Sequence, residues 1–309
     1  MNVKKSFDPH DMKAFEPAEK VGLISTINPE GLVHITLITS MMSPDPEHLA
    51  LGQFCVGLSK WFMQNNPHVG FLIMSLDRRM WRGKALWTHK KNNGPEFEFF
   101  NELPMFRYNA YFGINTVHYL DLVETSHPQS LPMAKIIPAA ILTKISKGAV
   151  KTKNPKRILK HFAEDLFNKL DTLKFISYIG HDGFPKIIPV IQCQAADSRR
   201  LVFSPFAYKN ELTDIPADIP VAVYCLNLDM QSVLIRGTFS GYTRNRLIKT
   251  GIVDIDWVYN SMPPKHEQIY PEIVLNPVVD FYKPFQNLPS DPISVLDRGG
   301  QSSKLGSRS

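Results

Sequence analysis

Short apolar runs separated by turn-forming residues recur along the whole chain. The first two runs, residues 21–28 and 32–41, are rich in Val, Ile, Leu and Thr and flank Pro29-Glu30-Gly31. β-Branched residues favour strands, and a glycine in this position supplies the positive φ that a tight turn needs. The pattern therefore predicts a β-hairpin near the N-terminus.

The same pattern continues through the first half of the chain. Further strands are predicted at residues 48–54, 69–76, 80–88 and 116–125. Residues 59–65 predict a short helix, with Ser59 as its N-cap and Asn66-Pro67 as its stop. Six strands and one short helix, without regular alternation of strands and helices, favour a small antiparallel barrel.

The order of these elements returns about 152 residues later, which is the separation of Gly31 from Gly183. The first three strands are repeated by residues 173–180, 186–194 and 201–205. Farther on, Ile235-Arg236-Gly237 echoes Trp81-Arg82-Gly83. Recurrence of elements in one order and at one spacing is typical of an internal duplication. The chain is therefore predicted to be a tandem repeat.

The repeat divides the chain into four segments. They are a first unit at residues 11–130, a basic linker at 131–160, a second and divergent unit at 161–262, and an extended C-terminal arm with a disordered tail at 263–309. A helix is expected to open each unit, at residues 11–20 and 155–170. Residues 144–160 hold seven Lys and Arg and no acidic residue, which either a solvated linker or a docking patch for an anionic partner would explain.

The composition is that of a folded protein with a modest excess of positive charge. The 309 residues are 43% hydrophobic and 21% charged, which excludes a disordered chain and a small disulfide scaffold. The net charge of +6 favours anionic partners such as phosphates, but it is too small to argue for nucleic acid.

Several function classes lack their motifs in this sequence. It has no glycine-rich dinucleotide fingerprint, P-loop, nucleophile elbow or paired-histidine zinc motif. Cys55, Cys193 and Cys225 lie far apart without metal-ligand spacing, which indicates a reducing compartment and no bound metal. Pro138 interrupts the longest aliphatic stretch, residues 136–142, and no signal-peptide core is present. We therefore expect a cytoplasmic protein with no membrane partner.

A phosphate site is suggested where Gly52-Gln53-Phe54 is followed by Gly57-Leu58-Ser59-Lys60. There a strand end would deliver the chain into a helix N-terminus, where backbone N–H groups, a hydroxyl and an ammonium converge as a phosphate requires. The plain alternative is that Ser59 only caps the helix and that Lys60 is solvated.

Two predicted strands add further polar groups. Because side chains alternate along a strand, Arg82 and Lys84 face one side of residues 80–88. An ordinary edge strand with solvated basic residues has the same pattern. His34 and Thr36 share a face of residues 32–41, although a lone histidine in a strand is more often a structural group than a catalyst.

Taken together, these segments resemble the FMN-binding split-barrel superfamily, which includes the pyridoxamine 5′-phosphate oxidase-like and flavin reductase-like proteins. The resemblance rests on GLISTINPEGLVHITLITS, LALGQFCVGLSKWFMQNNPHVGFLIM and RRMWRGKALWT in this order. It covers residues 15–126 and, with less agreement, residues 162–261. It implies a mainly β fold with short helices, in which two tandem split β-barrels pack as an intramolecular pseudo-dimer.

In such proteins FMN lies at the junction of two barrels. The cofactor-binding residues that the resemblance implies are His34, Ile35, Thr36, Gly52, Gln53, Phe54, Ser59, Lys60, Arg82 and Lys84. Ser59, Lys60 and Arg82 would hold the phosphate. The segment His34-Ile35-Thr36 would border the ribityl chain or the flavin, and Gly52-Gln53-Phe54 would present backbone or amide hydrogen bonds to the ring. The second unit has Ala207-Tyr208-Lys209-Asn210 where the first has its Ser-Lys turn, so we expect one well-formed FMN site in the first unit.

The function that the resemblance implies is that of an FMN-dependent oxidoreductase. Its bound flavin would move electrons between a reduced donor, such as NAD(P)H, and an unidentified small-molecule acceptor. The alternative is a non-catalytic module that holds FMN or haem for storage, sensing or assembly, because no catalytic residue is recognisable. A monomer with an internal pseudo-dimer and a homodimer are both compatible with the sequence.

Overall fold

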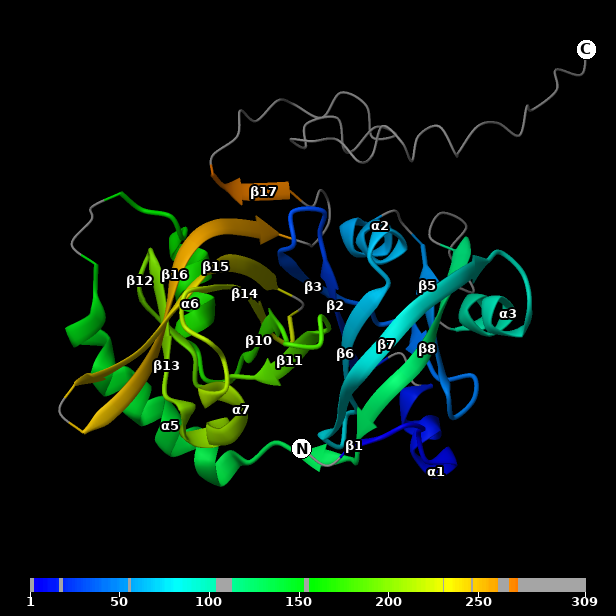
Figure 1. Cartoon of the computed structure of the whole chain (residues 1–309), viewed down its shortest axis with the longest axis horizontal. Helices are drawn as coiled ribbons and strands as arrows, with labels where there is room; N and C mark the ends of the chain where they lie inside the picture. Colours follow the sequence, from blue (N-terminus) through cyan, green and yellow to red (C-terminus); the bar gives the residue numbers. More distant parts are fainter. Residues whose placement is uncertain are drawn as a thin grey trace, which may run out of the picture.

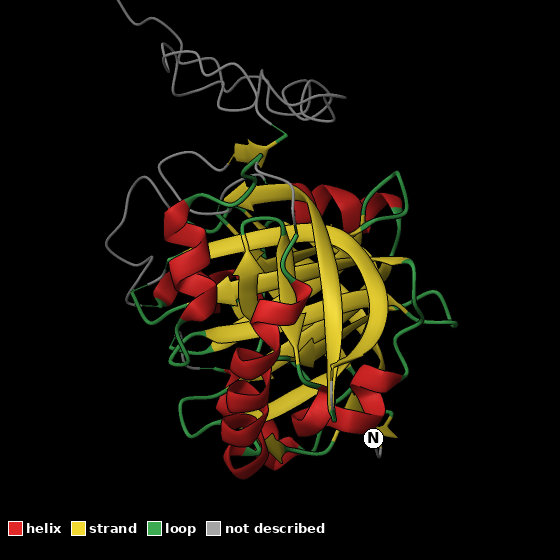
Figure 2. Ribbon diagram, turned by 90° about the vertical axis from the view of Figure 1, so that its left-hand side faces the viewer, coloured by secondary structure: helices red, strands yellow, loops and turns green. Residues whose placement is uncertain are grey.

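Two antiparallel β-sheets form the core of the protein. The computed structural model describes residues 3–16, 19–54, 57–103, 113–152, 156–229, 231–245, 247–260 and 267–271. Each half of the sequence builds one sheet, and the two sheets lie side by side (Figure 1). Short helices surround them (Figure 2). The prediction of a mainly β protein with short helices is confirmed.

The first sheet has nine strands in the order β3-β2-β6-β7-β8-β5-β4, with β1 paired to β8 and β9 paired to β7. The strands are β1 (Val3–Lys4), β2 (Val21–Ile27), β3 (Val33–Leu37), β4 (Met41–Met42), β5 (His48–Gln53), β6 (His68–Met74), β7 (Arg79–Lys91), β8 (Thr116–Ser126) and β9 (Gln129–Ser130). The helices are α1 (Pro9–Met12), the 3₁₀ helix η1 (Lys13–Phe15), α2 (Leu58–Asn65) and α3 (Pro95–Glu102). The sequence did not predict α3.

The second sheet has eight strands in the order β11-β10-β14-β15-β16-β13-β12, with β17 paired to β16. The strands are β10 (Leu173–Ile179), β11 (Pro185–Pro189), β12 (Gln194–Asp197), β13 (Arg200–Phe203), β14 (Ile219–Leu226), β15 (Ser232–Asn245), β16 (Ile248–Asn260) and β17 (Glu267–Tyr270). The helices are α5 (Met133–Ser146), η2 (Lys147–Val150), α6 (His161–Asn168), η3 (Pro205–Tyr208) and α7 (Lys209–Thr213). β17 lies in the segment expected to be an extended arm, and residues 272–309 lie outside the described residues.

Both sheets are open along one seam. β3 and β4 are the two ends of the first path, yet only residues 38–40 separate them in the sequence. Because so short a stretch of chain spans roughly 14 Å at most, the sheet must curl until its ends are close. β11 and β12 have the same relation across residues 190–193. The strand pairing therefore gives two curled sheets and not the closed barrels that the pattern favoured.

Strand pairing places the two halves in matching register. Ser25 lies opposite Ile35 and Gly70, and Ser177, 152 residues later, lies opposite Ile187 and Ala222. These opposing residues are separated by the same interval as the serines. Since glycines also occupy the two hairpins with similar positive φ, the repeated order seen in the sequence corresponds to repeated strand pairing.

The correspondence expected between Arg82 and Arg236 is wrong by two residues. Lys84 lies opposite Gly70 on β6, and Arg236 lies opposite Ala222 on β14. Arg236 therefore corresponds to Lys84. The expectation followed the shared Arg-Gly dipeptide, whereas the spacing set by β2 and β10 continues unchanged into β7 and β15.

The two sheets pack against each other through an apolar layer. Its buried members include Leu23, Val33, Ile35 and Leu72 of the first sheet and Phe175, Ile187, Tyr224 and Leu234 of the second. Within this layer, the fully buried hydroxyls of Ser25 and Ser177 form a 2.7 Å hydrogen bond. At Gly70 a Cβ would lie 2.2 Å from the carbonyl oxygen of Pro185, so the close approach of β6 and β11 requires glycine there.

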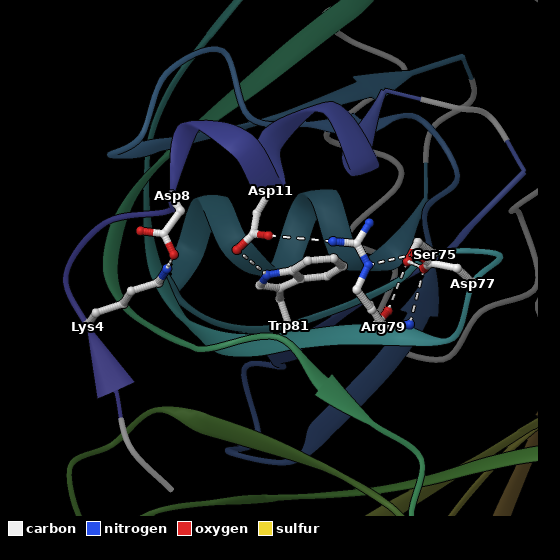
Figure 3. A network of polar contacts seen from close by, with 7 residues as sticks. All are labelled: Lys4, Asp8, Asp11, Ser75, Asp77, Arg79 and Trp81. Carbon is white, nitrogen blue, oxygen red and sulfur yellow. Dashed lines mark hydrogen bonds and ion pairs between the residues drawn. The ribbon is translucent and has the colours of Figure 1, made fainter.

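A polar network anchors the N-terminal helix to the first sheet (Figure 3). The indole nitrogen of buried Trp81 donates to Asp11 Oδ2 at 3.1 Å, and a guanidinium nitrogen of Arg79 lies 3.7 Å from Asp11 Oδ1. Arg79 Nε also donates to Asp77 at 2.6 Å. Hydrogen bonds from Ser75 and then from Arg79 lower the pKa of Asp77 to about 2. The network thus fixes α1 beside β7.

The segment expected to be a linker contains the 14-residue helix α5. The helix continues through Pro138, so the interruption expected there is wrong. Pro138 lies in the first half of α5 on its exposed side, and the carbonyl that its missing N–H leaves unpaired belongs to Ala134, which is also exposed to water. Among the described residues, no helix has both the length and the apolar content needed to cross a bilayer.

The Ser25–Ser177 hydrogen bond allows a direct test of the interface. Replacing either serine alone with alanine leaves the other hydroxyl buried without this partner, which costs about 1–3 kcal/mol of unfolding free energy. The double variant removes both groups, so its cost is smaller than the sum of the single costs. Urea unfolding of the four proteins measures this coupling, and additive losses would show that the two hydroxyls do not interact.

Candidate functional site

Helix α2 places polar side chains against strand β3. Its N-cap is Gly57, which has an extended backbone, so Ser59 is a helical residue and the prediction of Ser59 as N-cap is wrong. The Ser59 hydroxyl is instead hydrogen bonded to the Thr36 hydroxyl of β3. Ser59 and Lys60 are only 1% and 7% exposed. Two hydroxyls and a buried lysine therefore lie at the first turn of α2.

The charge of Lys60 acts on a buried histidine, His118. Trp87 Nε1 donates to His118 Nδ1 at 3.1 Å, and because an indole nitrogen can only donate, the proton of the neutral imidazole is on Nε2. That nitrogen donates to Gln53 Oε1 at 2.9 Å. Burial, followed by the charges of Lys60 and Lys90, lowers the pKa of His118 to about 3. His118 is therefore a neutral, oriented group at neutral pH.

The second half contributes aromatic rings to this region. The His34 ring is edge-on to Phe62 of α2 and to Tyr259 of β16, with 5.4 Å between centroids in each case. Trp257 stacks on Tyr259, with 5.2 Å between centroids and 8° between planes. The guanidinium carbon of Arg236 lies 3.8 Å from the centroid of the Trp257 ring. A stacked aromatic pair and a cation of the second half thus lie beside β3 and α2.

Arg236 has an unused hydrogen-bond donor. Its Nε atom is buried and has no hydrogen-bond partner among the described residues. Burial lowers the pKa of Arg236, although the charges of Glu30 and Asp256 oppose this change. An anionic or carbonyl oxygen that reached this nitrogen would supply the missing acceptor and offset the cost of burying the charge.

Arg82 and Lys84 are bound by carboxylates. Buried Arg82 makes a bidentate pair with Glu211 of α7, with distances of 2.8 and 3.0 Å. Lys84 Nζ lies 2.6 Å from a carboxylate oxygen of Glu124 and 2.7 Å from one of Asp182. Burial opposes the charge of Lys84, but its bonds with Asp182 and Glu124 outweigh burial and raise its pKa. A role for Arg82 in holding a phosphate and a role for Lys84 in binding the cofactor both remain predictions, and each would require these ion pairs to open.

A hollow of about 300 Å³ lies beside these ion pairs. Its lining includes Arg82, Lys84, Tyr178, Lys186, Ile188 and Glu211. In the matching register of the halves, Ile188 of β11 takes the place of Thr36 of β3. The second junction therefore lacks the hydroxyl that Thr36 supplies at the first. Nearby, the hydroxyl of Tyr208 is buried without a hydrogen-bond partner among the described residues, and burial raises its pKa to about 12. The two junctions between the halves therefore differ in chemistry.

Ile35, Gly52 and Phe54, the remaining predicted residues, have surroundings typical of structural positions. Ile35 is buried in the apolar layer between the sheets. Gly52 exchanges two hydrogen bonds with Ser40, and a Cβ there would lie 3.0 Å from Ile114 and 3.2 Å from Phe100, which is a tight fit. Phe54 is exposed at the end of β5. Their contact with a cofactor remains a prediction.

The sequence analysis missed four residues of this region, which are His118, Arg236, Trp257 and Tyr259. His118 carries no signal, because it is a single histidine within a strand. Arg236 was visible only as part of the Arg-Gly echo. Trp257 and Tyr259 are two positions apart and so share a strand face, but no motif linked that face to α2.

Metal ligation has no support in the described part of the chain, where no group of three or more His, Cys, Asp or Glu side chains is arranged to hold an ion. Cys193 and Cys225 are buried free thiols, and burial raises their pKa values to about 12 and about 11. Cys55 lies outside the described residues.

Comparison with known proteins yields only distant structural likenesses. No protein-family model matches the chain, and no curated protein matches it. An FMN-binding protein from Syntrophomonas wolfei subsp. wolfei is 12% identical over 39% of this chain and 84% of its own, with a TM-score of 0.33. A FAD-binding protein from Mesorhizobium loti is 12% identical over 40% of this chain and 97% of its own, with a TM-score of 0.28.

A solved structure that overlaps more of the chain is that of the Bacillus subtilis inhibitor of motility, MotI/DgrA. It is 6% identical over 77% of this chain and 87% of its own, with a TM-score of 0.22. The solved structures similar to this chain thus include flavin-binding proteins. At these TM-scores the likenesses carry no argument about activity.

The pKa of His118 predicts that the fold is sensitive to acid. The folded pKa of about 3 lies below the unfolded value of 6.5, so the unfolded chain binds more protons between these values. The contribution of His118 to stability is complete above the unfolded pKa and falls as the pH drops toward the folded one, by at most about 1.4 kcal/mol per pH unit. Urea unfolding of wild type and His118→Gln across this range measures the effect. Parallel pH profiles would show that His118 is not the group responsible.

Proposed function

We propose that this protein is an FMN-dependent oxidoreductase that binds FMN at the junction of its two sheets. The observation that carries the proposal is the group formed by Thr36, Ser59 and Lys60 at the first turn of α2. Two hydroxyls, a buried lysine and the N–H groups of a helix N-terminus form a donor set suited to a phosphate monoester. The sequence resemblance to FMN-binding split barrels supports the same ligand.

The second half provides a suitable wall for a planar ring. The stacked rings of Trp257 and Tyr259 present a flat surface near His34, and the Nε of Arg236 lacks an acceptor. A flavin has both an extended π surface and several hydrogen-bond acceptors, so it matches these two features. The phosphate donors come from the first half and the wall from the second, which supports a site between them.

Bound FMN would supply hydride or single-electron transfer between a reduced donor, such as NAD(P)H, and a small-molecule acceptor. The residues of the chain would hold and orient the cofactor. Ser59, Thr36 and Lys60 would fix its phosphate, while neutral His118 would keep Gln53 in one orientation at the edge of the site. Because both ring nitrogens of His118 are occupied, it would not exchange protons with a substrate near neutral pH.

We further propose that the halves are a tandem duplication packed as an intramolecular pseudo-dimer of split barrels, with one flavin per chain. Identical strand order and the Ser25–Ser177 contact between equivalent positions support the duplication. At the second junction the cations already have carboxylate partners, and Ile188 replaces a hydroxyl. These features argue against a second phosphate site.

A non-catalytic module that holds FMN is the second candidate function. His118 favours it, because this histidine near Lys60 stays neutral and offers no proton for catalysis near neutral pH. Steady oxidation of NADH or NADPH by the FMN-loaded protein would exclude this candidate. Loading with FMN but no turnover with either donor would favour it over the oxidoreductase.

Lys60→Met tests the phosphate site directly. Methionine keeps the length of the buried side chain but removes the charge, so the affinity for FMN should fall about tenfold to a hundredfold, as expected for the loss of a hydrogen bond to a charged group. Quenching of FMN fluorescence during titration measures the dissociation constant.

Lys13→Met is the matched control, because Lys13 is exposed on the 3₁₀ helix η1. It should leave FMN affinity unchanged. Riboflavin, which lacks the phosphate, should bind Lys60→Met and wild type equally. An unchanged FMN affinity in Lys60→Met would show that the phosphate is not held at α2.

A further inference from the structure

The outward face of helix α5 is apolar along its whole length. Met133, Ile137, Ile141 and Ile145 recur at every fourth residue and are 40%, 47%, 56% and 64% exposed. Side chains four residues apart lie on one side of a helix, so these four form a continuous stripe. The opposite side of α5 is buried against η3 and the second sheet. Such a stripe on a protein surface is typical of a contact surface.

The stripe lies within the most basic part of the chain. Between Glu124 and Glu164 the sequence has no acidic residue and eight Lys and Arg, which are Lys135, Lys144, Lys147, Lys151, Lys153, Lys156, Arg157 and Lys160. Lys135 and Lys144 lie on α5 itself and are exposed, as is Lys151 just beyond η2. The charged residues of α5 itself, next to its bulky aliphatic side chains, are therefore both lysines.

A hollow of about 620 Å³ opens at the C-terminal end of α5. Four cations line it, namely Lys144, Lys147, Lys151 and Arg157, together with the carboxylates of Glu164 and Asp197. Glu164 is 2.5 Å from Arg157, and the two oxygens of Asp197 accept the backbone N–H groups of Thr152 and Arg199. Neither carboxylate forms an ion pair with the three lysines in the described part of the chain.

The lysines of this hollow are crowded together. Lys147 donates at 2.6 Å to a neutral acceptor, Asn168 Oδ1. Burial, followed by the charges of Lys151 and Lys144, lowers the pKa of Lys147. Like charges gathered beside a hollow are stabilised by an anion that enters it, and phosphate oxygens are suitable acceptors for lysine.

We propose that α5 and the hollow at its end dock the protein onto an anionic membrane surface. The apolar stripe would lie among the upper acyl chains, and the lysines would contact lipid phosphates, as in interfacial amphipathic helices. A helix that projects its aliphatic side chains next to a hollow lined by lysines matches an amphiphile, which carries both an apolar and an anionic part. The expectation of no membrane partner rested on the lack of spanning segments, which surface docking does not need.

A second copy of this chain is a less suitable occupant of the same face. Two copies joined through α5 would bring the basic segments together, and like charges across an interface oppose association. The proposal is independent of the flavin site, because none of the residues of the stripe or the hollow belongs to the region around α2.

Sedimentation with lipid vesicles tests the proposal on the full chain. Wild type should sediment with vesicles of phosphatidylcholine mixed with phosphatidylglycerol, should bind pure phosphatidylcholine far more weakly, and should be released by added salt. Ile141→Ser/Ile145→Ser should lower the partition coefficient about tenfold or more through lost apolar burial. Lys144→Gln/Lys151→Gln should lower it about fivefold per charge removed.

Matched controls separate this face from general stickiness. Leu228→Ser/Leu247→Ser removes two apolar side chains that are 93% and 95% exposed elsewhere, and Lys5→Gln/Lys13→Gln removes two exposed charges outside the segment. Both control variants should bind the anionic vesicles like wild type. If they reduced vesicle binding as strongly as the α5 variants do, the proposal would be overturned.

Other occupants of the face give different results. A lower melting temperature of Ile141→Ser/Ile145→Ser would show that the chain itself covers the stripe, and a wild-type dimer that this variant makes monomeric would show that a second copy does. Each of these two results would overturn the proposal. Absence of wild-type binding to the anionic vesicles would overturn it as well.

Discussion

The close packing of the two sheets across the Ser25–Ser177 hydrogen bond is the contact on which the rest of the structure depends. It brings the carbonyl of Pro185 so near to β6 that only glycine fits at position 70. Because the two serines occupy matching positions, β3 of the first half meets β14 and β15, while β11 of the second half meets β6 and β7. One contact therefore creates two junctions between the halves, and each combines side chains from both.

The two junctions differ in a few side chains. At the first, Thr36, Ser59 and Lys60 gather donors near the aromatic pair and Arg236 of the other half. The Nε atoms of Arg236 and Arg82 are both buried without an acceptor among the described residues, so this feature is common to the two junctions. At the second, protein carboxylates already occupy the cations, since Glu211 binds Arg82 and Asp182 binds Lys84. A buried cation needs an anionic partner in either case. The difference is that the second junction contains its own anionic partners, the carboxylates of Glu211 and Asp182. This difference supports a ligand at the first junction and purely structural ion pairs at the second.

The sequence predicted most of the strands and the positive-φ glycines of the two hairpins, because these depend on local alternation and on turn chemistry. Its errors have equally local causes. A shared Arg-Gly dipeptide led to a correspondence for Arg236 that is wrong by two residues. Pro138 was read as an interruption, but α5 continues through it because the carbonyl left unpaired faces water. The site was predicted only in its first-half residues. Trp257, Tyr259 and His118 reach α2 or Lys60 through strand pairing and sheet packing, and no local pattern records which distant faces meet.

The amount of flavin retained per chain tests the central claim most directly, namely that one of the two junctions binds FMN and the other is closed by its own ion pairs. Purified protein is saturated with FMN and desalted, and the flavin released on denaturation is measured by absorbance against the protein concentration. The proposed arrangement predicts one equivalent of FMN per chain. Two equivalents would show that the ion pairs of Arg82 and Lys84 open to admit a phosphate, and retention of no flavin would contradict the assignment of the first junction as a cofactor site.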